Sequence, residues 1–124
     1  MSHITTIKSI LFNDLKILKK ATDRLNYDAP IIHQQEQDYQ LYQKEPVKGI
    51  ASIKLPDWTY PVVVNRKGEI HYDNYEGRWG DIRHLNGLKQ AYGIEKAKKL
   101  ARAQGYMTRE HQKLDGAVVL ELTR

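Results

Sequence analysis

The chain has 124 residues, which fits one compact domain and leaves no room for two. It contains no cysteine, which excludes disulfides, thiolate catalysis and cysteine-ligated metals, while 40% hydrophobic and 28% charged residues form a globular composition. The net charge of +5 permits an acidic partner without requiring one. We expect a single domain over residues 1–124, with no export signal and no membrane insertion, because no apolar stretch approaches ~20 residues.

The first third of the chain predicts a strand, a helix and the start of a second strand. β-Branched residues in His3–Leu11 favour a half-buried strand. Apolar residues in Leu15–Leu25 recur at spacings of three and four, which predicts an amphipathic helix whose N-cap is Asn13. A strand then opens at Pro30, and we interpret the polar run Gln34–Gln43 as an exposed loop.

The middle of the chain predicts further strands. Ile50–Leu55 alternates apolar and polar residues, which is typical of a strand with one face in water. Tyr60–Val64 and Glu69–Tyr72 flank the Gly-ended sequence Asn65–Gly68, which has the length of a hairpin turn. We therefore expect a β-hairpin here.

The last third predicts a long helix and a terminal strand. The helical pattern begins at Asp81 or Ile82 and runs to about Gln104, where Gly105 is a suitable C-terminal cap. Gly93 lowers helix stability by about 1 kcal/mol relative to alanine and leaves room for a kink or break. Ala117–Thr123 predicts a buried strand, since its larger apolar residues share one face: Val118, Leu120 and Leu122.

The element order is therefore strand, helix, three or four strands, helix, strand. This order predicts the α+β class, with a mainly antiparallel sheet and both helices on one face. The first and last strands can lie side by side in such a domain. We therefore expect a variant of the ferredoxin-like fold.

No catalytic residue, metal site or cofactor is predicted from the motifs. The histidines lack metal-ligand spacing, and His71 with Asp73 could meet Asp81 and His84 at a metal only if the intervening loop folds back. No serine lies in a nucleophile elbow, and no glycine-rich loop could cradle a phosphate. An enzyme is therefore the third of three functional hypotheses.

Aromatic residues are dense in the segment from Trp58 to Trp79, and basic residues are interspersed among them. The segment also holds Tyr60, Tyr72, Tyr75, Arg66, Lys67 and Arg78, with Arg83 just beyond it. These rings could fill the core, form a protein interface or stack on bases. At a protein interface, Trp79 or Tyr75 would be the buried anchor.

Positive charge is concentrated in the segment Ile94–Arg109. Its charged residues are Lys96, Lys98, Lys99, Arg102 and Arg109 against Glu95 alone. Two interpretations stay open, a solvated helix face and a surface that attracts an acidic partner. In the second, Lys98, Lys99 and Arg102 steer the partner's approach.

Several motifs resemble a known family over nearly the whole chain. They are the opening Met1–Lys8, then Asn65–Gly68 leading to Tyr72-Asp73, Leu88–Tyr92 and Ala101–Tyr106. As an ordered set they resemble the hypothetical chloroplast reading frame thirty-five, a plastid and cyanobacterial family of unknown function. The resemblance implies the plastid stroma or a cyanobacterial cytoplasm, and an AAA-type ATPase as a partner by gene neighbourhood. It implies no catalytic residue.

Together these observations favour a non-enzymatic accessory or adaptor protein. It would bind an acidic protein partner through the basic helix and the aromatic segment, at Trp79, Tyr75, Lys98, Lys99 and Arg102. The alternative is a small domain that binds RNA or single-stranded nucleic acid with the same residues. The salt dependence of binding separates the two, because phosphate neutralisation gives a steep loss of affinity with salt.

Overall fold

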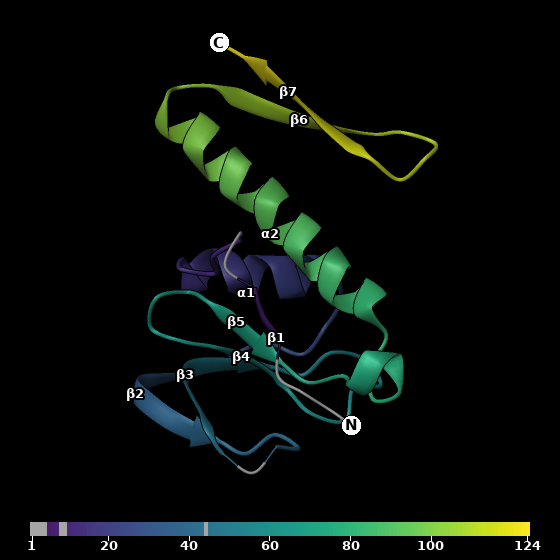
Figure 1. Ribbon diagram of the computed structural model, residues 1–124. Coiled ribbons are helices and arrows are strands. Elements are labelled where there is room, and N and C mark those ends of the chain that lie inside the picture. The colour runs from purple at the N-terminus through teal and green to yellow at the C-terminus, as the bar shows by residue number, and fades with distance from the viewer. Residues whose placement is uncertain (1–4, 8–9, 44) are drawn as a thin grey trace.

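The computed structural model describes residues 5–7, 10–43 and 45–124 (Figure 1). Its larger sheet is antiparallel with the order β1-β5-β4-β3-β2, and β6 and β7 form a separate hairpin. The strands are β1 (Thr5–Ile7), β2 (Ile31–Tyr39), β3 (Val47–Ile53), β4 (Val62–Val64), β5 (Ile70–Tyr72), β6 (Met107–Gln112) and β7 (Val118–Thr123). Both helices, α1 (Leu15–Arg24) and α2 (Ile82–Ala103), cover one face of that sheet (Figure 1). The predicted α+β class is confirmed.

The core lies between the sheet and the two helices. Side chains alternate across each strand, so every second residue of β3 and β4 faces the helices. The residues at the centre of this core are fully or almost fully buried: Ile17, Leu18, Ala21, Ala51, Ile53, Val62, Val64, Ile70, Leu85, Leu88 and Ala91. No helix in the described part of the chain carries an apolar stretch long enough to cross a bilayer.

Helix α1 begins one residue later than its predicted cap. Asp14 is the N-cap, and its Oδ1 accepts a hydrogen bond from the backbone N–H of Ile17 at 3.2 Å. The predicted cap, Asn13, accepts instead from the Tyr92 hydroxyl of α2 at 3.3 Å. A carboxylate at this position also interacts favourably with the positive end of the helix dipole.

The prediction of a loop at Gln34–Gln43 is wrong over its first part, because β2 continues through Gln34 to Tyr39. This strand pairs with β3, and its register shifts between Ile32 and Gln37. It is the edge of the sheet and is largely exposed on both faces, which explains its polar sequence.

The predicted hairpin at Asn65–Gly68 is confirmed. Asn65 Oδ1 accepts from the backbone N–H groups of Lys67 and Glu69 at 3.0 and 2.9 Å. Gly68 has φ +86°, and an added Cβ would lie 2.8 Å from the backbone nitrogen of Asn13. Glycine is therefore required at this position for two reasons. The turn needs a positive φ, and the segment that leads into α1 leaves no space for a Cβ.

Helix α2 is confirmed over Ile82–Ala103, and it continues through Gly93 without a break. The predicted cap at Gly105 is also confirmed, with φ +86°. Gly105 N–H donates to the carbonyl of Arg102, and Tyr106 N–H donates to that of Ala101, both at 3.0 Å. These two bonds define a Schellman motif.

The terminal strand is not the buried strand that the sequence predicts, and it does not lie beside β1. It pairs with β6 through a turn in which Gly116 has φ +88°, and the hairpin lies on the far side of α2 from the sheet (Figure 1). Val118 and Leu120 are half-buried, while Leu122 is 47% exposed. The apolar face of β7 covers part of α2. Its pairing partner is the preceding strand β6, because a short turn connects the two.

Candidate functional site

Four aromatic side chains meet at the surface near the start of α2, and we name them the Trp79 cluster. Trp79 stacks on Tyr75 with ring centroids 4.8 Å apart and an interplanar angle of 21°. Tyr42 and Tyr60 lie against the same indole at centroid distances of 4.7 and 5.6 Å. The cluster therefore joins three segments that are distant in the sequence.

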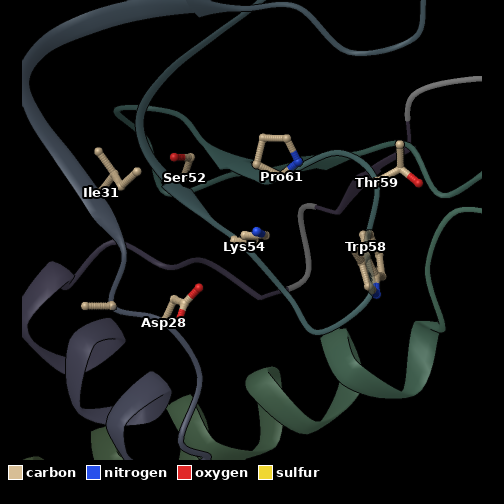
Figure 2. Close-up of a pocket in the computed structure, with 8 residues that line it drawn as sticks. Asp28, Ile31, Ser52, Lys54, Trp58, Thr59 and Pro61 are labelled. Carbon is tan, nitrogen blue, oxygen red and sulfur yellow. The ribbon is translucent and has the colours of Figure 1, made fainter.

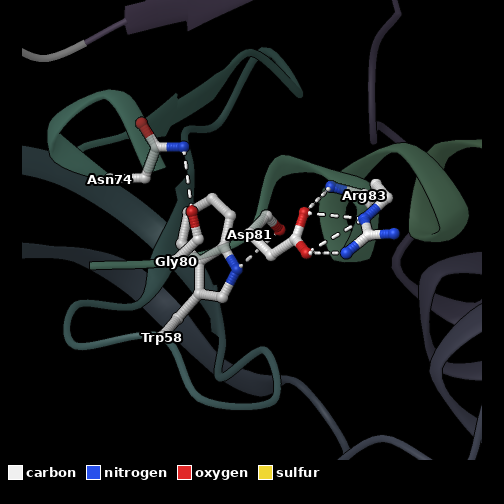
Figure 3. A network of polar contacts seen from close by, with 5 residues as sticks. All are labelled: Trp58, Asn74, Gly80, Asp81 and Arg83. Carbon is white, nitrogen blue, oxygen red and sulfur yellow. Dashed lines mark hydrogen bonds and ion pairs between the residues drawn. The ribbon is translucent and has the colours of Figure 1, made fainter. Parts of the chain in front are cut away.

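Hydrogen bonds hold the segment between β5 and α2 that carries Tyr75 and Trp79. Asp73 Oδ1 accepts from the backbone N–H of Tyr75 at 3.2 Å, and Asn74 Nδ2 donates to the carbonyl of Gly80 at 3.2 Å (Figure 3). The Trp79 backbone is bonded on both sides, to Asn74 at 3.0 Å and to Thr59 at 2.8 Å. The rings are thus presented by a fixed backbone.

The structure divides the aromatic segment into a core part and a surface part. Trp58 is 5% exposed and belongs to the core, with Tyr72 packed against it. Tyr60, Tyr75 and Trp79 are half-buried at the surface instead. The two predicted anchors, Trp79 and Tyr75, both belong to the surface part and are in direct contact with each other.

Tyr42 is the member of the cluster that sequence reasoning missed. It is 57% exposed and follows β2, in a polar stretch far from the aromatic segment. No local pattern points to it, because its contact with Trp79 depends on how the β2–β3 connection folds back. Arg78, a predicted basic neighbour, lies over the Tyr75 ring at 5.1 Å.

The basic residues of α2 are mostly paired within the chain. Lys98 Nζ lies 2.9 Å from Glu110 Oε2 and 3.4 Å from Glu95 Oε2. Lys99 and Lys96 both pair with Asp14, at 2.5 and 3.8 Å. These lysines hold α2 to the hairpin and to the start of α1.

Arg102 differs from the neighbouring lysines. It is exposed and makes no side-chain hydrogen bond or ion pair with the residues that the structure describes. At a rise of 1.5 Å per residue, the distance along α2 from its start to Lys98, Lys99 and Arg102 is roughly 25 Å or more. The structure therefore does not bring the predicted basic and aromatic residues together into one site.

The carboxylates of these pairs are held in the charged form. The hydrogen bond from Arg24 has the largest effect on Glu110, followed by that from Lys98, and together they lower its pKa to about 2. The hydrogen bond from Lys99 is the largest effect on Asp14 and lowers its pKa as well. Both carboxylates are ionised at neutral pH and serve as ion-pair partners.

The residues that could have met at a metal do not form such a site. Asp81 caps α2, and its Oδ2 pairs with Arg83 Nη2 at 2.7 Å, which lowers the pKa of Asp81 to about 2 (Figure 3). Over residues 5–7, 10–43 and 45–124, no three His, Asp or Glu side chains lie close enough together to hold a metal ion.

Comparison with protein families, curated proteins and solved structures gives no match for this chain. The resemblance to the reading frame thirty-five family therefore stays a prediction from the quoted motifs. What the protein does must be inferred from its surface chemistry.

Proposed function

We propose that the protein is a non-enzymatic adaptor that binds another protein through the Trp79 cluster. The observation that supports this most is the convergence of four rings from three segments on one surface, with Tyr42 57% exposed. Tryptophan and tyrosine dominate the binding energy of protein interfaces when they enter a partner's pocket. A surface of this composition suits a binding module.

The packing of the rings favours tight binding. Trp79 is stacked on Tyr75 and flanked by Tyr42 and Tyr60, so the side chains are already ordered before a partner arrives. A partner therefore needs to immobilise fewer rotatable groups, which lowers the entropic cost of association.

The charges around the cluster set the partner's expected chemistry. Arg78 is exposed, and its guanidinium lies over the Tyr75 ring at 5.1 Å from the centroid. We propose that the partner places an acidic residue opposite Arg78 and an apolar group against Trp79. Lys98 and Lys99 contribute less than the sequence suggests, because their charges are used within the chain.

The resemblance supplies the first partner to test. An AAA-type ATPase, in the plastid stroma or a cyanobacterial cytoplasm, is the partner that gene neighbourhood within the resembled family implies. Binding of RNA or single-stranded DNA remains the alternative, supported by the Trp79–Tyr75 stack beside Arg78. That alternative is weaker because the lysines that would neutralise phosphates lie at the other end of α2 and are paired.

The experiment compares Trp79→Ala and Tyr42→Ala with wild type and with a matched control, Tyr106→Ala, whose ring lies away from the cluster against Arg124. Each protein is tested for partner capture from a nuclease-treated plastid or cyanobacterial lysate, and then for binding kinetics with the purified partner. We expect Trp79→Ala to weaken binding by about 2 kcal/mol or more through faster dissociation.

Two results would overturn the proposal. One is that binding disappears after nuclease treatment and falls steeply with salt, which would establish nucleic-acid binding. The other is that Trp79→Ala lowers stability sharply while the remaining folded protein binds normally, which would make Trp79 a packing residue. Nuclease treatment and a salt titration identify the first case, and thermal melts of all variants identify the second.

A further inference from the structure

We propose that the pocket beside Trp58 binds a small zwitterion with an apolar body, such as an α-amino acid with a large apolar side chain. The pocket has a volume of about 330 Å³ and lies between the segment after α1 and the loop that joins β3 to β4 (Figure 2). It is separate from the Trp79 cluster, and the proposal does not depend on the adaptor function.

The pocket has an apolar interior of a size that suits a small ligand. Ile31, Trp58 and Pro61 contribute apolar walls (Figure 2). Ala29 also lines the pocket. Pockets for small molecules begin at about 300 Å³ and are lined mainly by apolar and aromatic groups. Ile31 is 61% exposed in the free protein, so a ligand that covers it gains from the removal of apolar surface from water.

The indole of Trp58 is a fixed wall of this pocket. Its Nε1 donates a hydrogen bond to the carbonyl oxygen of Asp81 at 3.1 Å (Figure 3). Gly80 lies directly against the ring, where an added Cβ would be only 2.3 Å from Cδ2. Tyr72 meets the ring edge-on with a centroid distance of 5.8 Å. The ring is therefore positioned before any ligand binds.

Two opposite charges stand at one side of the pocket. Asp28 and Lys54 line both the pocket and an adjoining hollow of about 150 Å³, which also includes Asn26 and Asp57. They therefore mark the boundary between an apolar space and a more polar one. Within the described part of the chain, neither side chain forms an ion pair or a hydrogen bond.

This arrangement selects the ligand's chemistry by charge complementarity. A ligand carboxylate would pair with the Lys54 ammonium, and a ligand ammonium would pair with the Asp28 carboxylate. A purely anionic or purely cationic ligand satisfies only one of the two protein groups and meets repulsion from the other. An α-amino acid supplies both charges on adjacent atoms, and its side chain can enter the apolar space beside Trp58.

The test uses L-phenylalanine as the probe and follows backbone amide and Trp58 indole N–H signals by two-dimensional NMR. We expect saturable shifts at Ala29, Ser52, Thr59 and the Trp58 indole. 3-Phenylpropanoate, which lacks the ammonium, and 2-phenylethylamine, which lacks the carboxylate, should each bind about tenfold more weakly, as expected for loss of one charged hydrogen bond.

Variants assign each charge to its partner. Asp28→Asn and Lys54→Gln should each weaken L-phenylalanine binding about tenfold. Asp28→Asn should leave 3-phenylpropanoate binding no weaker than in wild type, and Lys54→Gln should do the same for 2-phenylethylamine. The matched controls are Asp38→Asn and Lys48→Gln, which change exposed residues outside the pocket and should leave binding unchanged.

A filled pocket gives an independent check. Ala29→Met places a larger side chain at an exposed lining position and should abolish the shifts without unfolding the protein. The proposal is overturned if L-phenylalanine up to about 10 mM produces no saturable shift at the pocket, a limit that corresponds to negligible affinity. It is also overturned if binding occurs but is indifferent to both Asp28→Asn and Lys54→Gln.

Discussion

Glu110 joins the β6–β7 hairpin to both helices through its carboxylate. Arg24 of α1 donates to both carboxylate oxygens, and Lys98 of α2 donates to Oε2 at 2.9 Å. The side chain is 27% exposed, so these pairs are shielded from water better than an ordinary surface ion pair. A single residue on the hairpin thus has two cationic partners from different parts of the fold.

The low pKa of Glu110 predicts an acid-sensitive contribution to stability. Its pKa falls from 4.5 to about 2 on folding, so the contribution is fully present above about pH 4.5 and is lost as the pH falls towards 2. Urea unfolding between pH 7 and pH 2 should show that Glu110→Gln is less stable than wild type by about 1–2 kcal/mol at pH 7.

The difference between these two proteins should shrink across that acidic window, whatever the other carboxylates contribute. Glu121→Gln is the matched control, because Glu121 pairs with His111 on the exposed face of the same hairpin. It should follow the wild-type curve. A constant gap between wild type and Glu110→Gln down to pH 2 would contradict the assigned cause.

Helix α2 is the element that connects the layers of the molecule. Its first half supplies Leu85, Leu88 and Ala91 to the core, and its second half carries the lysines that reach α1 and the hairpin. Gly93 lies between these halves, is exposed, and would place an added Cβ in open space. The helix continues through Gly93 because packing on both sides outweighs a local propensity cost of about 1 kcal/mol.

Two glycines near or within α2 should respond oppositely to alanine. Gly93→Ala should raise the free energy of unfolding by about 0.5–1 kcal/mol, since it restores helix propensity without a clash. Gly80→Ala should lower it by about 1–3 kcal/mol, because the new Cβ would collide with the Trp58 ring. Urea titration measures both, and a neutral Gly80→Ala would show that the indole moves freely.

The elements defined by local patterns were the predictable ones. The apolar stripes of α1 and α2, the Asn65–Gly68 turn and the Gly105 cap each depend on residues within a few positions of one another. β7 has the same alternation as a buried strand, and nothing in that pattern tells which surface covers it. Its true partner, β6, is too polar to be recognised, because Glu110 faces ion-pair partners.

On the scale of the whole molecule, the sheet and helices form a core that does not include the hairpin. All residues at the centre of the core fall between Phe12 and Tyr92 in the sequence. The hairpin lies against the outer side of α2 (Figure 1). The sheet and its two helices are therefore complete without residues 107–124.

This separation predicts that a chain ending at Tyr106 still folds. Truncation removes Glu110 and the half-buried face of β7, so the melting temperature should fall, while unfolding stays cooperative. Circular dichroism melts and the dispersion of amide signals measure this. Ile53→Ala, in the fully buried core, is the contrasting variant and should cost about 2–5 kcal/mol in the full chain.

The opposite result, a truncated chain without a cooperative transition, would mean that the hairpin is part of the core. The sequence alone suggests that result, because Val118, Leu120 and Leu122 are spaced as on a buried strand face. Leu120 is only half-buried in the structure, which removes the basis for a large cavity cost there.

The candidate sites were predictable only in part for a related reason. Trp79 and Tyr75 stand out because aromatic residues are dense in their segment, and the structure does bring them together. Tyr42 and the Asp28–Lys54 pair become neighbours of their sites only through tertiary folding. Lys98 and Lys99 looked like a free basic surface because Asp14 and Glu110 are remote in the sequence.

The sheet order has a consequence for the rate at which the domain forms. Strands β2 to β5 are joined to their immediate neighbours in the sequence, so each pair closes a short loop. β1 pairs with β5, from which it is separated by most of the sequence that forms the core. Closing this long loop has the largest entropic cost of the strand pairings in the sheet. Structure that forms early in folding should therefore concentrate in the consecutive strands β2 to β5. β1 should pair last, at the free edge of β5.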